Sequence, residues 1–135
     1  MEEDGEIMVQ AVLIDTDIIV DFLRTDGGLL PKLVGMQQEG AAGLFISSIT
    51  MIELFAGDSA SRQAKLLEEL FGQFRIVPVD QVLARFVGEA KRGMRVNIAL
   101  GDFVIGMTAV WLGAKLATKN QKHFAQIEGL KFFEV

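Results

Sequence analysis

The chain has 135 residues, of which half are hydrophobic and 23% are charged, and it contains no cysteine. That length is enough for one domain with a core of its own, and the lack of cysteine excludes disulfides and thiolate metal sites. The uncharged runs, such as Phe103 to Ala114, are too short to cross a bilayer. These features predict a cytoplasmic globular protein without a membrane segment.

The formal net charge of −5 at pH 7 argues at first sight against a nucleic-acid partner. However, four of the acids lie in residues 1–7, which we expect to be a disordered acidic extension ahead of a single domain over residues 8–135. Basic residues gather in two places, around positions 91–95 and 115–122. The charge balance is therefore compatible with a polyanionic substrate that reaches the protein through bound metal.

Short apolar runs alternate with amphipathic segments along the chain. The apolar runs predict strands over residues 11–14, 44–46, 74–79, 115–118 and 131–135. The segments between them predict helices after a Thr16 cap to Arg24, over 29–38 and 49–56, from 58 to 71, after an Asp80 cap, and over 102–112, with an irregular link over 92–100 and a turn over 120–124. This order predicts an α/β fold with a central, mostly parallel sheet of four to five short strands in a three-layer α/β/α arrangement.

Three acidic residues stand within apolar sequence. Asp15 follows the first predicted strand, Glu53 interrupts the apolar helix over 49–56, and Asp102 opens an uncharged helix. A carboxylate flanked by core-forming residues is expected to lose part of its hydration, which is costly unless it is paired, protonated or bound to metal. Any one of them is also compatible with a helix cap or a solvated edge, but three together favour a site for a hard divalent cation.

The predicted topology brings these acids to one edge of the sheet. Asp15 lies at the carboxyl end of the first strand, and Thr118 and Asn120 lie at the end of the fourth. Glu53 is about two turns into the helix after the second strand, and Asp102 begins the helix before the fourth. Because sites in open parallel sheets form outside the carboxyl ends of the strands, we expect all five side chains to face one site.

At these positions the chain resembles PIN domains, and within them the small VapC ribonuclease toxins. The resemblance runs from Met8 to the end and rests on five segments in order: Leu13–Arg24, Ser48–Gly57, Gly101–Ala109, Leu116–Phe124 and Ile127–Leu130. It implies a PIN-like fold and an endoribonuclease that cleaves RNA phosphodiester bonds with Mg²⁺ or Mn²⁺. Asp15, Glu53 and Asp102 match the three acids that surround the metal in the family. Thr118 matches the family's hydroxyl residue.

The resemblance also implies partners and alternatives. In the family, a protein antitoxin inserts a segment into a hydrophobic groove, for which the helices over 31–38 and 62–71 are candidates here, and homodimers are common. This chain departs from the pattern at Asn120 and His123, where relatives carry a further acid. The missing fourth acid implies weaker binding of any second ion. It also keeps open a second reading, a catalytically weak or inactive PIN fold that binds RNA or protein.

Several charged and aromatic residues have simpler interpretations. We expect Asp21 to be a solvated partner of Arg24, Asp17 to lie near the site without being a ligand, and Trp111 to be part of the core. Arg24 and Lys119 are candidate phosphate contacts beside the site. The lone histidine, His123, is read as polar surface with a smaller case for a general acid. The sequence leaves open the RNA target, the number of metal ions, the oligomeric state and the identity of an antitoxin.

Overall fold

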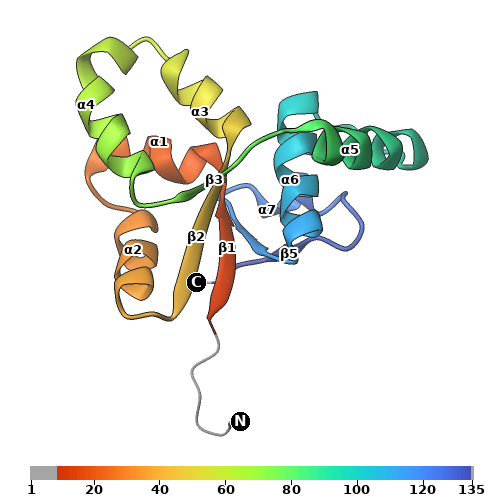
Figure 1. The fold of residues 1–135 in the computed structure, drawn as a ribbon, viewed down its shortest axis with the longest axis horizontal. Helices are drawn as coiled ribbons and strands as arrows, with labels where there is room; N and C mark the ends of the chain where they lie inside the picture. The colour runs from red at the N-terminus through yellow and green to blue at the C-terminus, as the bar shows by residue number, and fades with distance from the viewer. Residues whose placement is uncertain (1–8, 135) are drawn as a thin grey trace, which may run out of the picture.

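The computed structural model describes residues 9–134, so the expected acidic extension and Val135 lie outside the described residues. Five parallel strands form one sheet in the order β3-β2-β1-β4-β5, between two layers of helices (Figure 1). The strands are β1 (Gln10–Ile14), β2 (Ala42–Ser47), β3 (Arg75–Val77), β4 (Lys115–Ala117) and β5 (Lys131–Phe132). The predicted fold class, a three-layer α/β/α domain, is confirmed.

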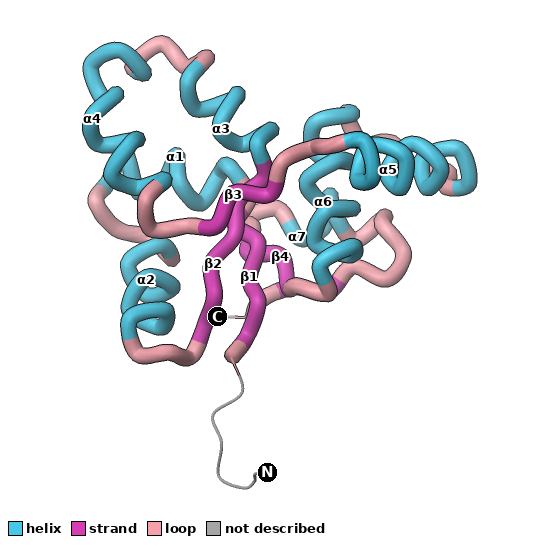
Figure 2. Tube along the Cα trace, in the orientation of Figure 1, coloured by secondary structure: helices cyan, strands magenta, loops and turns pink. Residues whose placement is uncertain are grey.

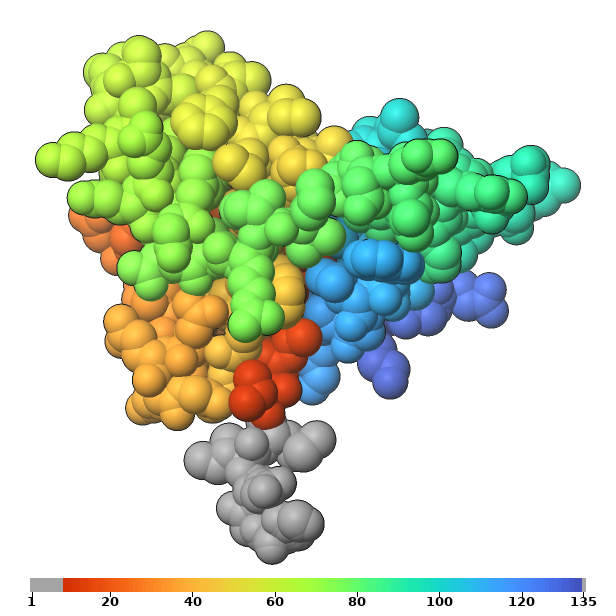
Figure 3. Space-filling view, in the orientation of Figure 1, coloured from red at the N-terminus to blue at the C-terminus, as the bar shows by residue number. Residues whose placement is uncertain are grey.

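Seven helices are found within residues 9–134 (Figure 2). They are α1 (Thr16–Thr25), α2 (Leu30–Gln38), α3 (Ser48–Phe55), α4 (Ala60–Phe71), α5 (Gln81–Gly93), α6 (Leu100–Leu112) and α7 (Gln121–Phe124). In the space-filling view α4 and α5 lie on opposite sides of the molecule (Figure 3). Over the described residues, none of these helices has the length and apolar character needed to cross a membrane.

Strand β1 divides the core into two parts. Its residues Val12 and Ile14 pack with α1, α2 and α4 on one face of the sheet. Leu13, between them in sequence, packs with α5, α6 and α7 on the other face. Side chains of a strand alternate between faces, so an uninterrupted apolar strand is what a sheet covered on both sides requires.

The predicted element boundaries differ from the observed ones at several ends. Helix α6 begins two residues before Asp102, and α5 continues to Gly93, into the stretch predicted as irregular. The predicted turn at 120–124 contains the one-turn helix α7, and β5 ends at Phe132. Periodicity locates the middle of an element, whereas its ends depend on local hydrogen bonds, which explains these shifts.

One prediction about the core was wrong. Trp111 was assigned to the core, but it is 43% exposed, because it lies on the outer side of the otherwise buried helix α6. Leu66 on α4 and Val82 on α5 are likewise apolar but exposed, and the buried positions of those helices include Leu67 and Leu83. Hydrophobic spacing identifies a helix more reliably than it identifies which apolar residues face the core.

A glycine allows the last helix to lie close to α6. Gly106 lies in the buried part of α6, and a Cβ atom added there would collide with Ile127 and would come within 3.3 Å of Phe124. Phe124 belongs to α7 and is almost fully buried. The missing side chain at Gly106 therefore lets α7 pack beside α6, where its residues lie near the carboxyl end of β4.

Candidate active site

Asp15 lies where β1 turns into α1. It is 5% exposed and caps α1, because its Oδ1 accepts a hydrogen bond of 2.8 Å from the backbone N–H of Thr16. Thr16 was predicted to be the cap; the cap is instead the residue before it. A carboxylate at a helix N-terminus is stabilised by the unpaired amides of the first turn.

A second set of hydrogen bonds holds Asp15 from β4. The Thr118 hydroxyl donates to Asp15 Oδ2 at 2.8 Å and accepts from the Asn120 N–H at 3.0 Å. Asp17 accepts from the Lys119 N–H at 3.1 Å and lies 3.4 Å from the Thr118 hydroxyl. Asp15, Asp17 and Thr118 therefore form a hydrogen-bonded floor that joins the start of α1 to the end of β4.

Glu53 stands on α3, on the opposite side of the site from this floor. Its Oε1 accepts a hydrogen bond of 2.6 Å from the Thr16 hydroxyl, which also lies 2.9 Å from the Thr50 hydroxyl. Glu53 is exposed, so the prediction that it is desolvated was wrong. Its neighbour Leu54 is the buried residue of that turn, because a charge on an apolar helix rotates toward solvent where the packing allows it.

Asp102 lies in the first turn of α6 and faces α7. His123 Nε2 is 3.3 Å from Asp102 Oδ2, and the two side chains are 28% and 37% exposed. His123 was expected to be an ordinary surface residue; it is half-buried and contacts a predicted ligand. Glu53, Asp102 and His123 form the rim of the site, and each stands on a helix rather than at a strand end.

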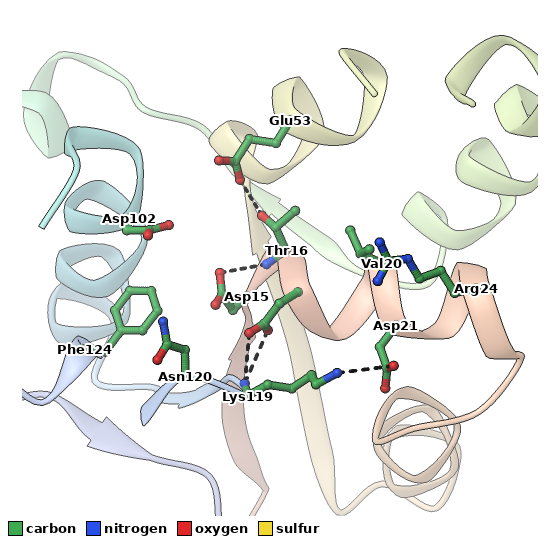
Figure 4. Close-up of a pocket in the computed structure, with 11 residues that line it drawn as sticks. Asp15, Thr16, Val20, Asp21, Arg24, Glu53, Asp102, Lys119, Asn120 and Phe124 are labelled. Carbon is green, nitrogen blue, oxygen red and sulfur yellow. Dashed lines mark hydrogen bonds and ion pairs between the residues drawn. The ribbon is translucent and has the colours of Figure 1, made fainter. Parts of the chain in front are cut away.

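The floor, together with Glu53 and Asp102 of the rim, borders one cavity of about 450 Å³ (Figure 4). Its lining includes the acids Asp15, Asp17, Asp21, Glu53 and Asp102, together with the predicted contacts Arg24, Lys119 and Asn120. Thr118 does not line the cavity, but its hydroxyl holds Asp15, which does. The structure thus brings every predicted site residue to this cavity or to its floor, whereas their catalytic and metal-binding roles stay predictions.

The ion pairs of α1 differ from the predicted ones. Asp21 was assigned to Arg24, but its Oδ1 lies 3.3 Å from the Lys119 Nζ. Figure 4 shows Lys119 extended along the cavity toward Asp21, while Arg24 stands further along α1. Two cations therefore accompany five carboxylates around the cavity, which leaves it strongly electronegative.

That charge changes the acidity of the floor. Burial first, and then the charge of Asp17, raise the pKa of Asp15 from 3.8 to about 7, although hydrogen bonds from Thr118 and Thr16 act in the opposite direction. Burial also raises the pKa of Asp17. Both shifts mean that an ionised floor is electrostatically unfavourable without further positive charge. Raised carboxylate pKa values of this kind are common at functional sites.

The donor set fits a hard divalent cation in its chemistry. Carboxylate oxygens are the ligands that such ions prefer, and a cation would offset the burial and the neighbouring negative charges that raise the pKa of Asp15. The arrangement is not assembled, because over residues 9–134 no three acidic or histidine side chains are close enough to hold one ion between them. Their oxygens are engaged instead by Thr16, Thr118 and His123. Binding therefore requires side-chain rotation at the rim.

Two further cavities lie beside α1. One, of about 340 Å³, continues from the acidic cavity and shares Val20, Arg24 and Glu53 with it. The other, of about 290 Å³, is mostly apolar and lies between α1, α2 and α4; its lining residues are Phe22, Leu30, Pro31, Val34, Gly35, Gln38, Leu70 and Gln73. The groove predicted between the second and fourth helices is therefore present.

The sequence interpretation underestimated two residues of the site. Asp17 was placed nearby without a role, yet it lines the cavity and holds the backbone of Lys119. His123 contacts Asp102. The spacing of Asp15 and Asp17 across a strand-to-helix junction is a signal that could have identified the first. The second depends on the packing of α7 against α6, which the sequence alone does not specify.

Comparison with known proteins gives the family. The family described as PIN domain matches residues 12–130. The protein named Ribonuclease VapC10 from Mycobacterium tuberculosis is 32% identical, and the match covers 89% of this chain and 90% of that protein.

Solved structures agree with this match. The chain is similar to a structure of VapBC2 from Rickettsia felis bound to a DNA fragment, with a TM-score of 0.78 and 19% identity over 92% of this chain and 98% of the other. It is also similar to a toxin–antitoxin complex from Klebsiella pneumoniae, with a TM-score of 0.68 and 26% identity over 92% and 99%. The first likeness bears on the fold alone. Matched over nearly its whole described length, the chain belongs to the PIN domain family.

Proposed function

We propose that this protein is a metal-dependent endoribonuclease of the VapC kind, the toxin of a toxin–antitoxin pair. The observation that carries the proposal is the electronegative cavity, where the buried Asp15 has a pKa of about 7 and faces Glu53 and Asp102. A relative 32% identical over most of its length is named a ribonuclease, which supports the same activity here. RNA is therefore the proposed substrate.

Asp15, Glu53 and Asp102 would hold Mg²⁺ or Mn²⁺. When bound, such an ion would lower the pKa of a water molecule, so that a hydroxide nucleophile is available near neutral pH. Its positive charge would also stabilise the phosphate oxygens. The chain's own groups prepare this site. Thr118 and the Thr16 amide fix both oxygens of Asp15, and Glu53 is free to turn from Thr16 into the cavity because it is exposed.

Substrate positioning falls to the two cations of the cavity. Lys119 and Arg24 line it on the α1 side, and we assign them contacts with phosphates on one side of the cleaved bond. Lys119 is held at its backbone by Asp17 and at its side chain by Asp21. Asn120 completes the lining beside Lys119 and offers an amide to a phosphate oxygen or a bound water.

A protein antitoxin is the proposed partner. The apolar cavity between α1, α2 and α4 fits a hydrophobic segment, and the neighbouring cavity leads from α4 to Arg24 and Glu53. A bound segment that follows both cavities would reach the rim of the active site and obstruct substrate. The 26% identical structure of a toxin–antitoxin complex from Klebsiella pneumoniae supports such a partner. Homodimer formation, frequent in the family, is part of the proposal and is tested by the mass of the purified protein in solution.

The proposal is tested by incubating purified protein with structured RNA in Mg²⁺, in Mn²⁺ and in EDTA, alongside an Asp102→Asn variant. We expect cleavage that requires metal and is lost in the variant, because Asp102 lies at the cavity while its replacement keeps the helix intact. The protein must first be freed of any co-purified partner, which the mass of the sample verifies. Cleavage that persists in EDTA would refute the metal-dependent site.

The second candidate is a PIN fold that binds RNA or protein without cleaving it. The observation that favours it is the pairing of Asp102 with His123, in a sequence that also has Asn120 where relatives carry an acid. Intact RNA in every lane, combined with retarded migration of the RNA–protein complex, would support this reading over the nuclease.

A further inference from the structure

The charges of the chain are divided unevenly along its sequence. Residues 90–127 carry six lysine and arginine residues and a single carboxylate, that of Asp102. The other described residues, 9–89 and 128–134, carry seven cations and thirteen carboxylates. The overall negative charge therefore conceals a basic segment that contains the end of α5, all of α6 and β4, and α7. The three helices lie on one side of the molecule (Figure 1).

Four of these six cations have no role so far. Lys115 stands at the amino end of β4, away from the cavity, and Lys119 is already assigned to the α1 side. Within residues 9–134, none of the other four forms an ion pair with a carboxylate. Their side chains are exposed, so their positive charge is presented to solvent. We call these four residues the basic flank: Lys91, Arg92, Arg95 and Lys122.

Two contacts connect the basic flank to the first turn of α6. The Lys91 Nζ lies 5.1 Å from the ring centre of Phe103, the residue that follows Asp102. The loop after α5 is joined to the end of α7, because the Asn97 N–H donates a hydrogen bond of 2.8 Å to Gln126 Oε1. The segments that carry the basic flank are thus fixed beside α6, whose Asp102 lines the acidic cavity.

The dipole of α5 explains only part of the basic flank. Lys91 and Arg92 stand in the last turn of α5, where cations are stabilised by the unpaired carbonyl groups. Arg95 lies beyond the end of that helix, and Lys122 belongs to α7. The dipole also does not account for the absence of carboxylates over residues 90–101. A surface that carries charge of one sign beside a cavity attracts a ligand of the opposite sign, here a polyanion.

We propose that the basic flank binds the RNA strand on the α6 side of the cavity, through contacts with its phosphates. Arg24 and Asp102 stand on opposite sides of the cavity (Figure 4). A strand that is cut in the cavity extends from it in both directions, so the cations of α1 can hold only one of its two ends. The groove assigned to an antitoxin lies between α1, α2 and α4, which leaves the α6 side to the substrate. This inference rests on the proposed function, because it takes RNA as the ligand.

The first test measures RNA binding as a function of salt concentration, by fluorescence anisotropy of a labelled single-stranded RNA of mixed sequence. An Asp15→Asn background prevents cleavage. For Arg95→Gln combined with Lys122→Gln, we expect the affinity to fall on the order of tenfold. The slope of log affinity against log salt should decrease by about 1.4, because each lost phosphate contact removes about 0.7. The matched control, Arg62→Gln combined with Lys65→Gln, removes the same charge from exposed positions of α4 and should keep the slope.

The second test locates the basic flank on the RNA. Because the chain has no cysteine, a single introduced cysteine can carry a photocrosslinker at one known position. We expect crosslinks from Arg95→Cys and from Lys122→Cys to fall on one side of the bond that the unmodified protein cleaves. Crosslinks from Arg24→Cys should fall on the other side, and Lys65→Cys on α4 should crosslink only weakly.

The outcomes separate the basic flank from the function beneath it. Cleaved RNA together with equal salt slopes in the two double variants, or equally strong crosslinks from α4, would overturn the role of the flank and leave the nuclease intact. Binding that depends on the flank without any cleavage would support the flank and favour the second candidate function. RNA that neither binds to the folded, partner-free protein nor is cut by it would overturn both.

A competing ligand for the basic flank is an acidic protein segment, and poly-glutamate serves as its probe. Poly-glutamate binding that is lost in the double variant of the flank, while RNA binding is unchanged, would assign the surface to a protein and overturn the proposal. A thermal melt of each variant verifies folding, which the exposure of the substituted side chains should leave intact.

Discussion

The floor and the rim of the cavity are built in different ways. The floor, formed by Asp15, Asp17 and Thr118, joins the end of β4 to the start of α1 and is tied by hydrogen bonds. The rim, formed by Glu53, Asp102 and His123, stands on three helices and is partly or fully open to solvent. The floor is therefore part of the folded core, whereas the rim residues lie on the surface of helices that pack against that core.

This difference separates stability from function. A change in the floor disturbs buried charge and buried hydrogen bonds, so it alters the free energy of unfolding as well as the chemistry of the site. A change in the rim should alter the chemistry while leaving the free energy of unfolding almost unchanged. The predictions below test this division, from the largest expected effect to the smallest.

The largest effect is expected for Asp15→Asn. Asparagine keeps an acceptor for the Thr16 N–H but removes the buried charge, so in EDTA at pH 8 the variant should be more stable by a few kcal/mol. RNA cleavage should fall on the order of a thousandfold. Urea unfolding and a cleavage assay measure the two quantities. A variant that is less stable than the unmodified protein at pH 8 would contradict the conclusion that the ionised Asp15 destabilises the fold.

The pH dependence of stability follows from the same residue. The folded pKa of Asp15, about 7, exceeds the unfolded value of 3.8, so the folded state binds more protons between these values. Its contribution to stability is full below about pH 3.8 and is lost as the pH rises through 7, at up to roughly 1.4 kcal/mol per pH unit. The raised pKa of Asp17 acts in the same direction. Urea unfolding in EDTA should show this slope, and Asp15→Asn should flatten it.

Thr118→Val tests the hydrogen bonds of the floor. Valine keeps the shape but leaves the Asn120 N–H and one oxygen of Asp15 without the hydroxyl, so unfolding should become easier by about 1–3 kcal/mol. The pKa of Asp15 should rise further, because the Thr118 hydrogen bond lowers it. Carboxyl ¹³C NMR measures the pKa. Thr118→Ser is the control, since it keeps the hydroxyl and should keep the pKa of the unmodified protein.

The two regions also differ in how well the sequence predicts them. An apolar run that ends in Asp15 predicts a buried strand followed by an acid at its carboxyl end, and the structure has this arrangement. Thr118, after β4, is placed by the same rule. Parallel topology fixes such positions, because every strand ends at the same edge of the sheet.

The rim depends on contacts that the sequence does not encode locally. Glu53 was predicted to be desolvated from its apolar neighbours, but the direction of a helical side chain depends on the rotation of α3 against the sheet. The contact between Asp102 and His123 depends on how α7 packs beside Gly106. Residues far apart in sequence set both geometries, so composition and spacing leave them open.

Glu53→Gln tests the independence of the rim. Glutamine retains an oxygen for the Thr16 hydroxyl on an exposed helix face, so the free energy of unfolding should change by less than about 0.5 kcal/mol. Cleavage should nevertheless fall roughly a hundredfold, because the charge that faces the cavity is lost. Equal losses of stability and activity would show that the rim is as much a part of the core as the floor.

The smallest overall effect is expected for Lys119→Met, which sharpens the comparison from the substrate side. The Lys119 side chain is 56% exposed and its ion pair with Asp21 spans 3.3 Å, so the pair contributes no more than about 1 kcal/mol. If Lys119 binds a phosphate, RNA affinity should fall several-fold and its salt dependence should decrease by about one counterion. Fluorescence anisotropy in an Asp15→Asn background measures both without cleavage. Lys32→Met, on α2 and outside the cavity lining, removes the same charge as a control. An equal loss in the two variants would assign the effect to net charge and would remove Lys119 from the substrate path.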